Sequence, residues 1–352
     1  MDAAPARRRL TGVAKAAAPG RLAGLLGVAF ALVLCLAPAT AKARAGASPP
    51  QVFLLTSSPD SLSDLQAHAR AVGVVYPTYY ECAVPGGALT GSVVPAAAAY
   101  LKAARLAVMP RFYCADGATV HRILSDPRLR AATLAELVAI GEEPANRGIC
   151  LDLENDGAPD RSAMSSFVAQ LASRLHARRR RLSVVVVGVS GETPGASTSF
   201  YDDRAISASA DSVFVLAWGT HWAGSGPGPI APFSYVTGVV RYVASLPEAS
   251  RFVVGAPMYG LDWSGAGEAI AYQYSEVSAL VRSLGVTPMR DPASDELTFS
   301  YLADGVEHQV WYMDARATAH VLEIARAKHL AVGLWRLGSE DQRIWSSPTV
   351  LG

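Results

Sequence analysis

Two carboxylates at the end of one predicted strand are the residues of this chain best suited to do chemistry. Segment 147–156 reads RGICLDLEND, in which aliphatic residues alternate with Asp152 and Glu154. Because successive side chains of a strand point to opposite faces, the two acids share one face, about 7 Å apart. A carboxylic acid beside a carboxylate is what cleavage of a glycosidic bond requires. The other interpretation is a strand that ends in a solvated acidic turn, with residues 155–157 capping the next helix.

The elements that must position this pair are predicted from the apolar pattern. Eight strand-like runs recur with helix-length segments between most of them, which is typical of parallel strands joined by helical crossovers. Eight such units predict a closed (β/α)8 barrel of the α/β class, whose active sites lie at the carboxyl ends of the strands. The runs span residues 52–56, 73–79, 106–113, 148–154, 182–189, 212–218, 252–258 and 331–337.

Two further segments complete this architecture. Apolar residues at helical spacing between Met164 and Leu175 predict a helix that packs against the outside of the barrel. Residues 264–330 are too many for one crossover, and they contain helix-like residues 274–284 and β-like residues 297–312. We therefore expect a small α+β insertion between the seventh and eighth strands, which forms one wall of a cleft.

The amino-terminal residues have the composition of an export signal. Basic residues precede an apolar run at 22–36, which is followed by small residues in the pattern of a cleavage site. This order predicts a signal peptide over residues 1–43, a linker over 44–50 and a catalytic barrel over 51–352. The apolar run is short for a membrane-spanning helix, so an uncleaved anchor is the second choice. We expect a secreted, periplasmic or cell-envelope protein without a stable membrane anchor.

The remaining composition limits cofactors and partners. Cys82 and Cys114 can pair in an oxidising compartment or stay free, and Cys150 lies on the inner face of the acidic strand. The sequence has no cysteine or histidine cluster with zinc spacing, so we expect neither a metal nor another cofactor. A net charge of +1 with 17% charged residues gives no basic field for nucleic acid. A monomer is expected.

Several separated segments carry a family resemblance, and they occur in the family's order. They are YPTYY at 76–80, GICLDLEN at 148–155, residues 201–211, HWAG at 221–224, GPGPIAP at 226–232, GAPMYGLDW at 255–263, HQVWYMDA at 308–315 and GLWRLG at 333–338. Through them the chain resembles glycoside hydrolase family 18, and within it the bacterial branch of spore-cortex and cell-wall N-acetylglucosaminidases. The resemblance covers most of the chain after the signal and supports the predicted barrel.

This resemblance implies a mechanism. It implies retaining hydrolysis of a β-1,4 bond that follows N-acetylglucosamine, with the substrate's own acetamido group as the nucleophile. The family's strand-four motif assigns the general acid to Glu154 and the residue that orients the acetamide to Asp152. The implied partner is a polysaccharide that contains N-acetylglucosamine, either peptidoglycan or a chitin-like polymer.

The same resemblance assigns aromatic residues to substrate binding. Trp335 matches the tryptophan under the reacting sugar, and Tyr259 matches an aromatic residue beside that sugar. An aromatic plate suits the apolar face of a pyranose ring. Trp222 and Trp263 are expected to line the cleft as well. Without the family match, barrel packing would be the simpler explanation of Tyr259 and Trp335.

The chain departs from the family's motifs in two strands. Arg147 and Cys150 stand where the strand-four motif has an Asp and then an Asp or Asn. In the sixth strand, Trp218 and Gly219 replace a tyrosine that binds the acetamido oxygen and the acid next to it. An indole N–H can donate to the same oxygen, so Trp218 is expected to bind substrate, but Gly219 cannot replace the acid. We therefore expect a glycosidase of weakened activity, and the alternative is a catalytically impaired barrel that binds such glycans.

Overall fold

The computed structural model describes residues 48–155, 157–191, 195–265 and 268–351. The expected signal peptide and the first part of the linker lie outside these residues. Among the helices formed within these ranges, none is both long and apolar enough to cross a membrane.

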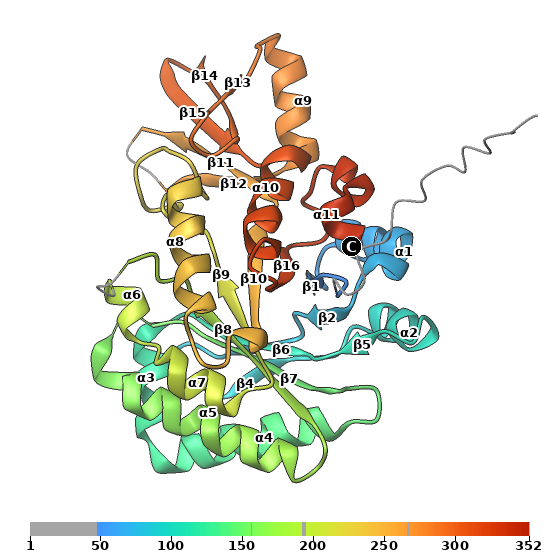
Figure 1. Ribbon diagram of the computed structural model, residues 1–352, viewed down its shortest axis with the longest axis vertical. Helices are drawn as coiled ribbons and strands as arrows, with labels where there is room; N and C mark the ends of the chain where they lie inside the picture. Colours follow the sequence, from blue (N-terminus) through green and yellow to red (C-terminus); the bar gives the residue numbers. More distant parts are fainter. Residues whose placement is uncertain (1–47, 156, 192–194, 266–267, 352) are drawn as a thin grey trace, which may run out of the picture. The chain divides into compact units, whose positions relative to one another are not determined.

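Parallel strands close into a barrel at the centre of the described region (Figure 1). In this region eight strand positions pair in chain order around the ring, and the eighth pairs with the first. β5 and β6 share one position, because only Met109 and Pro110 separate them. The positions are β1 (Gln51–Leu54), β2 (Val74–Pro77), β5 (Ala107–Val108) with β6 (Arg111–Cys114), β7 (Gly148–Leu153), β8 (Arg181–Val187), β9 (Ser212–Leu216), β10 (Phe252–Pro257) and β16 (Ala331–Trp335). The predicted (β/α)8 barrel is confirmed, and each predicted run overlaps one of these positions.

A short hairpin extends the second strand position. β3 (Tyr80–Cys82) runs parallel to β6 and antiparallel to β4 (Leu89–Gly91). The hairpin was not predicted, because strands this short carry too few residues for an alternating pattern. At the end of β3, Cys82 forms a disulfide with Cys114, with 5.3 Å between the Cα atoms. This settles the pairing that the sequence left open.

Helices cover the outer face of the barrel. They are α1 (Pro59–His68), α2 (Pro95–Ala103), α3 (Gly117–Ser125), α4 (Pro127–Glu142), α5 (Arg161–His176), α6 (Ala196–Ser199), α7 (Asp203–Ser209), α8 (Phe233–Ala244), α10 (Ala315–Arg326) and α11 (Pro348–Leu351), with short 3-10 turns at Ala69–Ala71, Ala158–Asp160, Ala249–Arg251 and Gln342–Ser346. Local signals start α3 and α4, since Asp116 and Asp126 accept hydrogen bonds from N–H groups of the first turns. The predicted apolar stripe of α5 is buried as Met164, Phe167, Val168, Leu171, Ala172 and Leu175.

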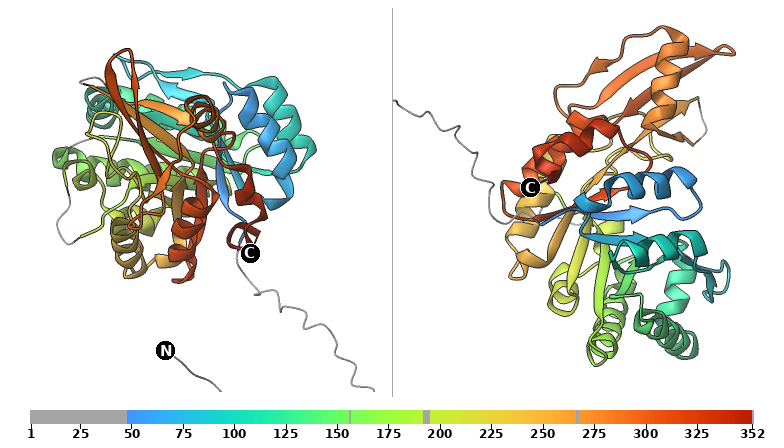
Figure 2. Two further views of the ribbon diagram at one scale, coloured as in Figure 1. Left: turned by 90° about the horizontal axis from the view of Figure 1, so that it is seen from above. Right: turned by 90° about the vertical axis from the view of Figure 1, so that its right-hand side faces the viewer.

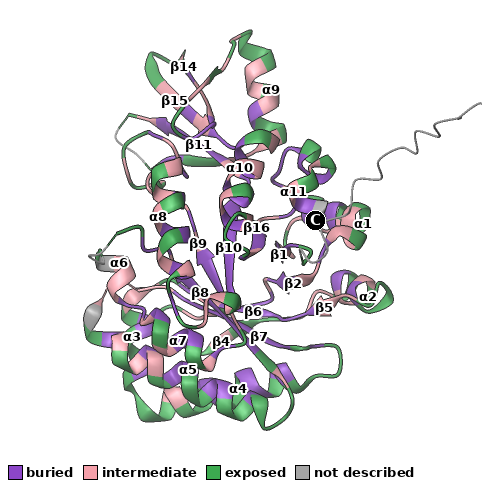
Figure 3. Cartoon of the chain, in the orientation of Figure 1, coloured by how far each residue is buried: buried purple, intermediate pink, exposed green. Residues whose placement is uncertain are grey.

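The core has one layer outside the strands and one inside the ring. The outer layer packs the strands against the helices, and Figure 3 shows strands β7 to β10 buried and the outward faces of α3, α4 and α5 exposed. The inner layer, called the interior cluster below, consists of Phe53, Tyr76, Met109, Cys150, Val185, Phe214 and Val253. The barrel is therefore a filled core, and Cys150 points inward as the sequence indicated.

A second sheet separates β10 from the last barrel helix. Its strands in the described residues are β11 (Tyr259–Ser264), β12 (Ile270–Gln273), β13 (Met289–Arg290), β14 (Leu297–Ala303) and β15 (Val306–Tyr312), all antiparallel, and α9 (Tyr274–Leu284) packs on β11. Figures 1 and 2 show β13 to β15 and α9 grouped at one end of the barrel.

The bounds of this second sheet differ from the insertion expected at residues 264–330. The sheet begins earlier, at Tyr259, because only Met258 separates β10 from β11. It ends at Tyr312, and α10 belongs to the barrel, where it packs against β10 and β16. The apolar pattern continues through Met258, so it does not mark the residue at which the strand changes its partners.

Candidate active site

The two predicted acids lie at the carboxyl end of the fourth barrel strand. All residues of β7 are buried, and the exposed fraction of Asp152 is 1%. Glu154 follows β7 and is half-buried, and its N–H donates to the Cys114 carbonyl at 2.8 Å. This bond continues the pairing of β7 with β6 past the end of the strand, so the two acids keep the same-face relation of a strand. Asp152 is thus a residue of the barrel interior and not of a solvated turn.

An arginine that the sequence analysis did not select binds Asp152. The Arg111 Nε and Nη2 groups lie 2.6 and 2.5 Å from the same oxygen, Asp152 Oδ2. Arg111 lies on β6, next to β7, and is 7% exposed. A cation within an apolar strand is itself a signal, because a charge in a barrel interior must be paired. The identity of its partner depends on strand register, which cannot be read from the sequence.

The Arg111 guanidinium also contacts the predicted sugar floor. Its Cζ lies 4.0 Å from the centre of the Tyr113 ring and 4.9 Å from that of Trp335. Trp335 in turn meets Phe53 edge to face, with 4.9 Å between ring centres. Arg111 contacts both Trp335 and Asp152, and so it links the predicted sugar floor to the acidic pair. The strands that contain these residues, β16 and β7, are not neighbours in the barrel.

Burial and the neighbouring side chains act on the pKa of Asp152 in opposite directions. Burial raises the pKa of Asp152, while the Arg111 charge and the Glu154 side chain act in the opposite direction. Its second oxygen, Oδ1, is buried and receives no hydrogen bond from an N–H or hydroxyl group of the described residues. Burial and the Glu154 charge raise the pKa of Tyr113 to about 12, so this phenol stays protonated at neutral pH. Asp152 Oδ1 is therefore an acceptor, beside Glu154, to which no N–H or hydroxyl group of the described residues donates.

A neutral polar network replaces the missing acid below Asp152. Burial, followed by the Asp152 charge, raises the pKa of the Cys150 thiol well above its ordinary value. The thiol lies beside Ser183, whose Oγ is 3.1 Å from the Tyr76 hydroxyl. Tyr76 also donates to the side-chain oxygen of Gln51. The position at which the resembling family has a carboxyl or amide thus carries no charge at neutral pH.

Four of the predicted aromatic residues pack in or next to the barrel mouth. Trp218, Tyr259 and Trp263 contact one apolar cluster with Ile230 and Leu261. Trp218 also packs against the interior cluster, as does Trp335.

One tryptophan of the same apolar cluster was missed, although it lies in a segment that carried the resemblance. Trp311 on β15 contacts this cluster, and its indole N–H and that of Trp263 are buried without an acceptor in the described residues. Trp222 differs from all of these, since it is 58% exposed and its ring lies over Gly224.

The substituted sixth strand has a backbone that explains its glycine. Trp218 follows β9, and a methyl group at Gly255 on β10 would come within 2.9 Å of Trp218 Cζ3, so the small residue makes room for the indole. Gly219 has φ +94°, a conformation that favours glycine. Its N–H donates to the Ile230 carbonyl at 2.9 Å. A side chain at position 219, including that of the acid in the family's motif, would therefore be strained in this turn.

A carboxylate directly before β14 anchors the loop that follows this turn. Glu296 is fully buried and accepts hydrogen bonds from the N–H groups of Ile230 (2.8 Å) and Ala231 (2.7 Å). Burial raises the pKa of Glu296 to about 7. This residue was also missed, because it lies more than 60 positions from the loop it binds.

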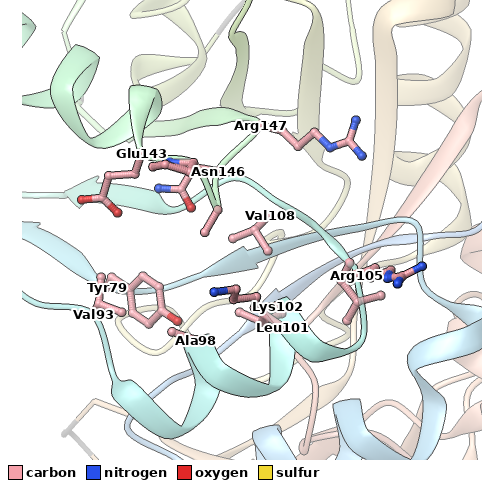
Figure 4. A pocket seen from close by; sticks show the side chains of 13 residues that line it. Tyr79, Val93, Ala98, Leu101, Lys102, Arg105, Val108, Glu143, Asn146 and Arg147 are labelled. Carbon is pink, nitrogen blue, oxygen red and sulfur yellow. The ribbon is translucent and has the colours of Figure 1, made fainter.

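Two cavities of the structure lie away from this site. One, of about 300 Å³, lies between α2 and the segment before β7, with Lys102, Arg105, Glu143 and Arg147 around it (Figure 4). The other, of about 480 Å³, lies between α5 and α7. None of the predicted site residues lines either cavity. In the ranges that the structure describes, no three His, Cys, Asp or Glu side chains are placed to hold a metal ion.

The chain is similar to known proteins in both sequence and fold. The model of the family described as Glycosyl hydrolases family 18 matches residues 116–340. YdhD of Bacillus subtilis (strain 168) is 27% identical over 224 residues, which cover 62% of this chain and 53% of YdhD. The cortical fragment-lytic enzyme of Bacillus anthracis is 24% identical over 230 residues, which cover 63% of this chain and 54% of that enzyme. The chain thus spans about half the length of the curated relatives it matches.

Among solved structures, a chitinase from Chromobacterium violaceum ATCC 12472 is similar over nearly its whole length. The superposition has a TM-score of 0.77 and 26% sequence identity, and it covers 87% of this chain and 98% of the chitinase. The family model's match over residues 116–340 includes the acidic strand, the second sheet and the last barrel strand.

Proposed function

The chain belongs to glycosyl hydrolases family 18, and from that membership we propose that it is a glycosidase that cleaves β-1,4 bonds after N-acetylglucosamine. The observation that carries the proposal is the buried Asp152 with one oxygen in reserve, beside Glu154 at the end of the fourth strand. Barrel enzymes place their catalytic groups at the carboxyl ends of strands. A binding protein would need neither a buried carboxylate without a donor nor an acid next to it.

In the proposed reaction, Glu154 and Asp152 have different tasks. Protonated Glu154 donates its proton to the glycosidic oxygen, while the acetamido oxygen of the same sugar attacks the anomeric carbon. Asp152 Oδ1 accepts the acetamido N–H and stabilises the positive charge that develops on the cyclic intermediate. Water then opens this intermediate, and its proton returns to Glu154, so the configuration at the anomeric carbon is retained. The substrate supplies the nucleophile, and no second enzymic one is required.

The aromatic residues supply the sugar-binding surface in this proposal. Trp335 lies under the reacting sugar, at the distance from Asp152 that the intervening Arg111 sets. Trp218 donates its indole N–H to the acetamido oxygen in place of the family's tyrosine. Tyr259 and Trp263 form the neighbouring wall, where the unpartnered N–H of Trp263 suits a sugar hydroxyl. Trp222 is the outermost contact.

The relatives support a substrate class and a location. One is named as a cortical fragment-lytic enzyme and one solved structure as a chitinase. Both names fit polymers that contain N-acetylglucosamine, so we propose peptidoglycan or a chitin-like polymer as the substrate. The basic and apolar pattern of residues 1–43 supports export to the cell envelope or the medium. We further propose that the protein acts as a monomer without a metal, another cofactor, a membrane anchor or a nucleic-acid partner.

The test compares the chain from residue 44 onward with its Glu154→Gln variant. Both are incubated with purified peptidoglycan and, in parallel, with chitin oligosaccharides, and released reducing ends and muropeptides are measured. Hydrolysis by the first protein and none by the second is the expected result, with the β anomer as the first product seen by NMR. If neither protein cleaves either polymer and both bind one of them, the changed sixth strand has left a glycan-binding barrel.

A further inference from the structure

Arg111 is a charged residue of the barrel interior to which the proposed reaction gives no task. Burying a guanidinium is unfavourable unless a charged partner is present, so its place beside Asp152 requires an explanation. Arg111 is 7% exposed and Asp152 is 1% exposed. Their contact joins the third and fourth strand positions at the level of the two acids.

The form of this contact is unusual for an arginine and a carboxylate. Such pairs commonly use two parallel hydrogen bonds, one to each oxygen. Here Nε and Nη2 both reach Oδ2, at 2.6 and 2.5 Å, and Oδ1 receives no hydrogen bond from an N–H, alcohol or phenol group of the described residues, although the Glu154 carboxyl group lies beside Asp152. Rotation of the carboxylate would break both contacts at once, so the two oxygens keep their places.

We infer that Arg111 is a positioning residue that divides the two oxygens of Asp152, holding Oδ2 in place and leaving Oδ1 for the acetamido N–H of the substrate. The inference rests on the proposed function, because it assigns Oδ1 to that reaction. It adds a residue that neither the strand-four motif nor the strand-six motif contains.

The position of the guanidinium is fixed from its other side. Its Cζ lies over the Tyr113 and Trp335 rings, 4.0 and 4.9 Å from their centres. A planar cation stacks on aromatic rings, and a lysine ammonium cannot reproduce both the stack and the two-donor fork. Arg111 therefore ties the sugar floor to the carboxylate, so that the two keep one relative position during the reaction.

The charges around Asp152 require a cation at this point. The titratable groups near it are Glu154, which follows β7, Cys150 below it, and Arg111 and Tyr113 on β6. The thiol and the phenol are neutral at pH 7, since burial raises the pKa of both. Arg111 is thus the positive charge among these groups, and it lowers the pKa of Asp152 against the effect of burial.

The test uses two substitutions that separate charge from geometry. Arg111→Met removes both, and we expect kcat to fall by about 10²-fold or more, with a smaller change in KM. The acid limb of the kcat–pH profile should move to higher pH by about one unit or more, because loss of an opposite charge raises the pKa of Asp152. Arg111→Lys keeps the charge, so its kcat should fall about tenfold or more while the acid limb stays in place.

Arg290 offers a matched control. Its Nη1 and Nη2 groups bind both oxygens of Asp314, at 3.2 and 2.6 Å, outside the site. Arg290→Met should lower the unfolding temperature and leave the kcat of the folded enzyme and its pH profile unchanged. If folded Arg111→Met shows the same behaviour, the role of Arg111 is structural and the inference is overturned. If Arg111→Met yields no folded protein, a wild-type kcat in Arg111→Lys overturns it.

A second readout does not depend on activity. With 13C in the aspartate carboxyl groups, the Asp152 signal is assigned by its loss in Asp152→Asn and followed by NMR against pH. We expect this signal to titrate at higher pH in Arg111→Met than in the wild type. An unchanged titration overturns the inference. A wild-type protein that hydrolyses nothing, but shows the shifted titration in the variant, would refute the proposed function and leave the Arg111–Asp152 coupling standing.

Discussion

Two buried aspartates in this protein, each paired with an arginine, differ in whether both carboxylate oxygens accept hydrogen bonds. In the barrel, Nε and Nη2 of Arg111 both donate to Asp152 Oδ2, and Oδ1 receives no hydrogen bond from an N–H, alcohol or phenol group of the described residues. At the second sheet, Arg290 donates to both oxygens of Asp314, and the Ala317 N–H also donates to Oδ1 at 2.9 Å. The two aspartates are 1% and 4% exposed, so burial does not distinguish them.

The difference is the one expected between a structural carboxylate and a carboxylate with the role that we propose for Asp152. Asp314 caps α10 and ties the second sheet to the barrel helix, and its acceptors are all used. Asp152 keeps an acceptor for which folding supplies no partner, and a buried polar atom without a hydrogen bond costs about 1–3 kcal/mol. This unfavourable free energy is tolerated at a binding site, because a bound ligand supplies the missing hydrogen bond. Substitutions that change one pair and leave the other intact test this distinction.

The largest effect is expected when Asp152 loses its charge. Asp152→Asn keeps the shape but weakens the stabilisation of the cyclic intermediate, so kcat should fall by about 10² to 10³-fold, roughly 3–4 kcal/mol. Its unfolding temperature should also fall, because Arg111 loses its counter-charge. Rates measured on chitin oligosaccharides test this, with Asp314→Asn as the matched control. Equal losses of kcat in both variants would remove the distinction between the pairs.

Glu296 extends the comparison to a third buried carboxyl group, whose oxygens are both used. Its folded-state pKa of about 7 exceeds the ordinary value, so between about pH 4.5 and 7 the folded protein holds a proton that the unfolded chain has released. The free energy of unfolding should therefore be highest below this window and fall by about 3 kcal/mol as pH rises through it.

Urea unfolding of the wild type and of Glu296→Gln, measured at several pH values from 4.5 to 7.5, tests this dependence. The difference between the two proteins should shrink or change sign across the window, because the amide does not titrate. Glu307→Gln is the control, since Glu307 is exposed on the same sheet. Parallel curves for all three proteins would show that Glu296 titrates normally.

A smaller effect is expected when the satisfied pair is broken. Asp314→Ala removes the helix cap and the partner of Arg290, which is half-buried and can turn toward water. The free energy of unfolding should fall by about 2 kcal/mol. The kcat of the folded protein should not change, because Asp314 does not touch the acidic pair. A loss of kcat without a loss of stability would contradict the structural assignment.

The smallest effect concerns the tryptophan that lies outside the packed cluster. Trp222 is 58% exposed, so Trp222→Ala should leave the free energy of unfolding unchanged. If it stacks on a sugar away from the reacting bond, the substitution should raise KM by less than about tenfold and spare kcat. Trp335 lies beside Arg111, so Trp335→Phe should lower kcat, unlike Trp222→Ala. Oligosaccharides of increasing length show whether only the longer ones lose affinity.

Much of the fold was predictable, because the signals for it are local. Alternation along each strand and helical spacing between strands identify the eight strand positions and the buried stripe of α5. The insertion between the seventh and eighth strands was expected at residues 264–330, whereas its sheet spans residues 259–312. Its first strand follows β10 after one residue, and an apolar pattern does not show where a strand exchanges one set of partners for another.

The sequence by itself determined that Asp152 and Glu154 share a face at the end of a barrel strand, because side-chain direction in a strand depends only on the parity of the position. Tertiary structure decided that Arg111 meets Asp152, that Cys82 meets Cys114, and that Glu296 holds the loop after Trp218. These contacts depend on strand register and on closure of the ring. Both are set by the packing of residues far apart in the chain, and no local pattern records them.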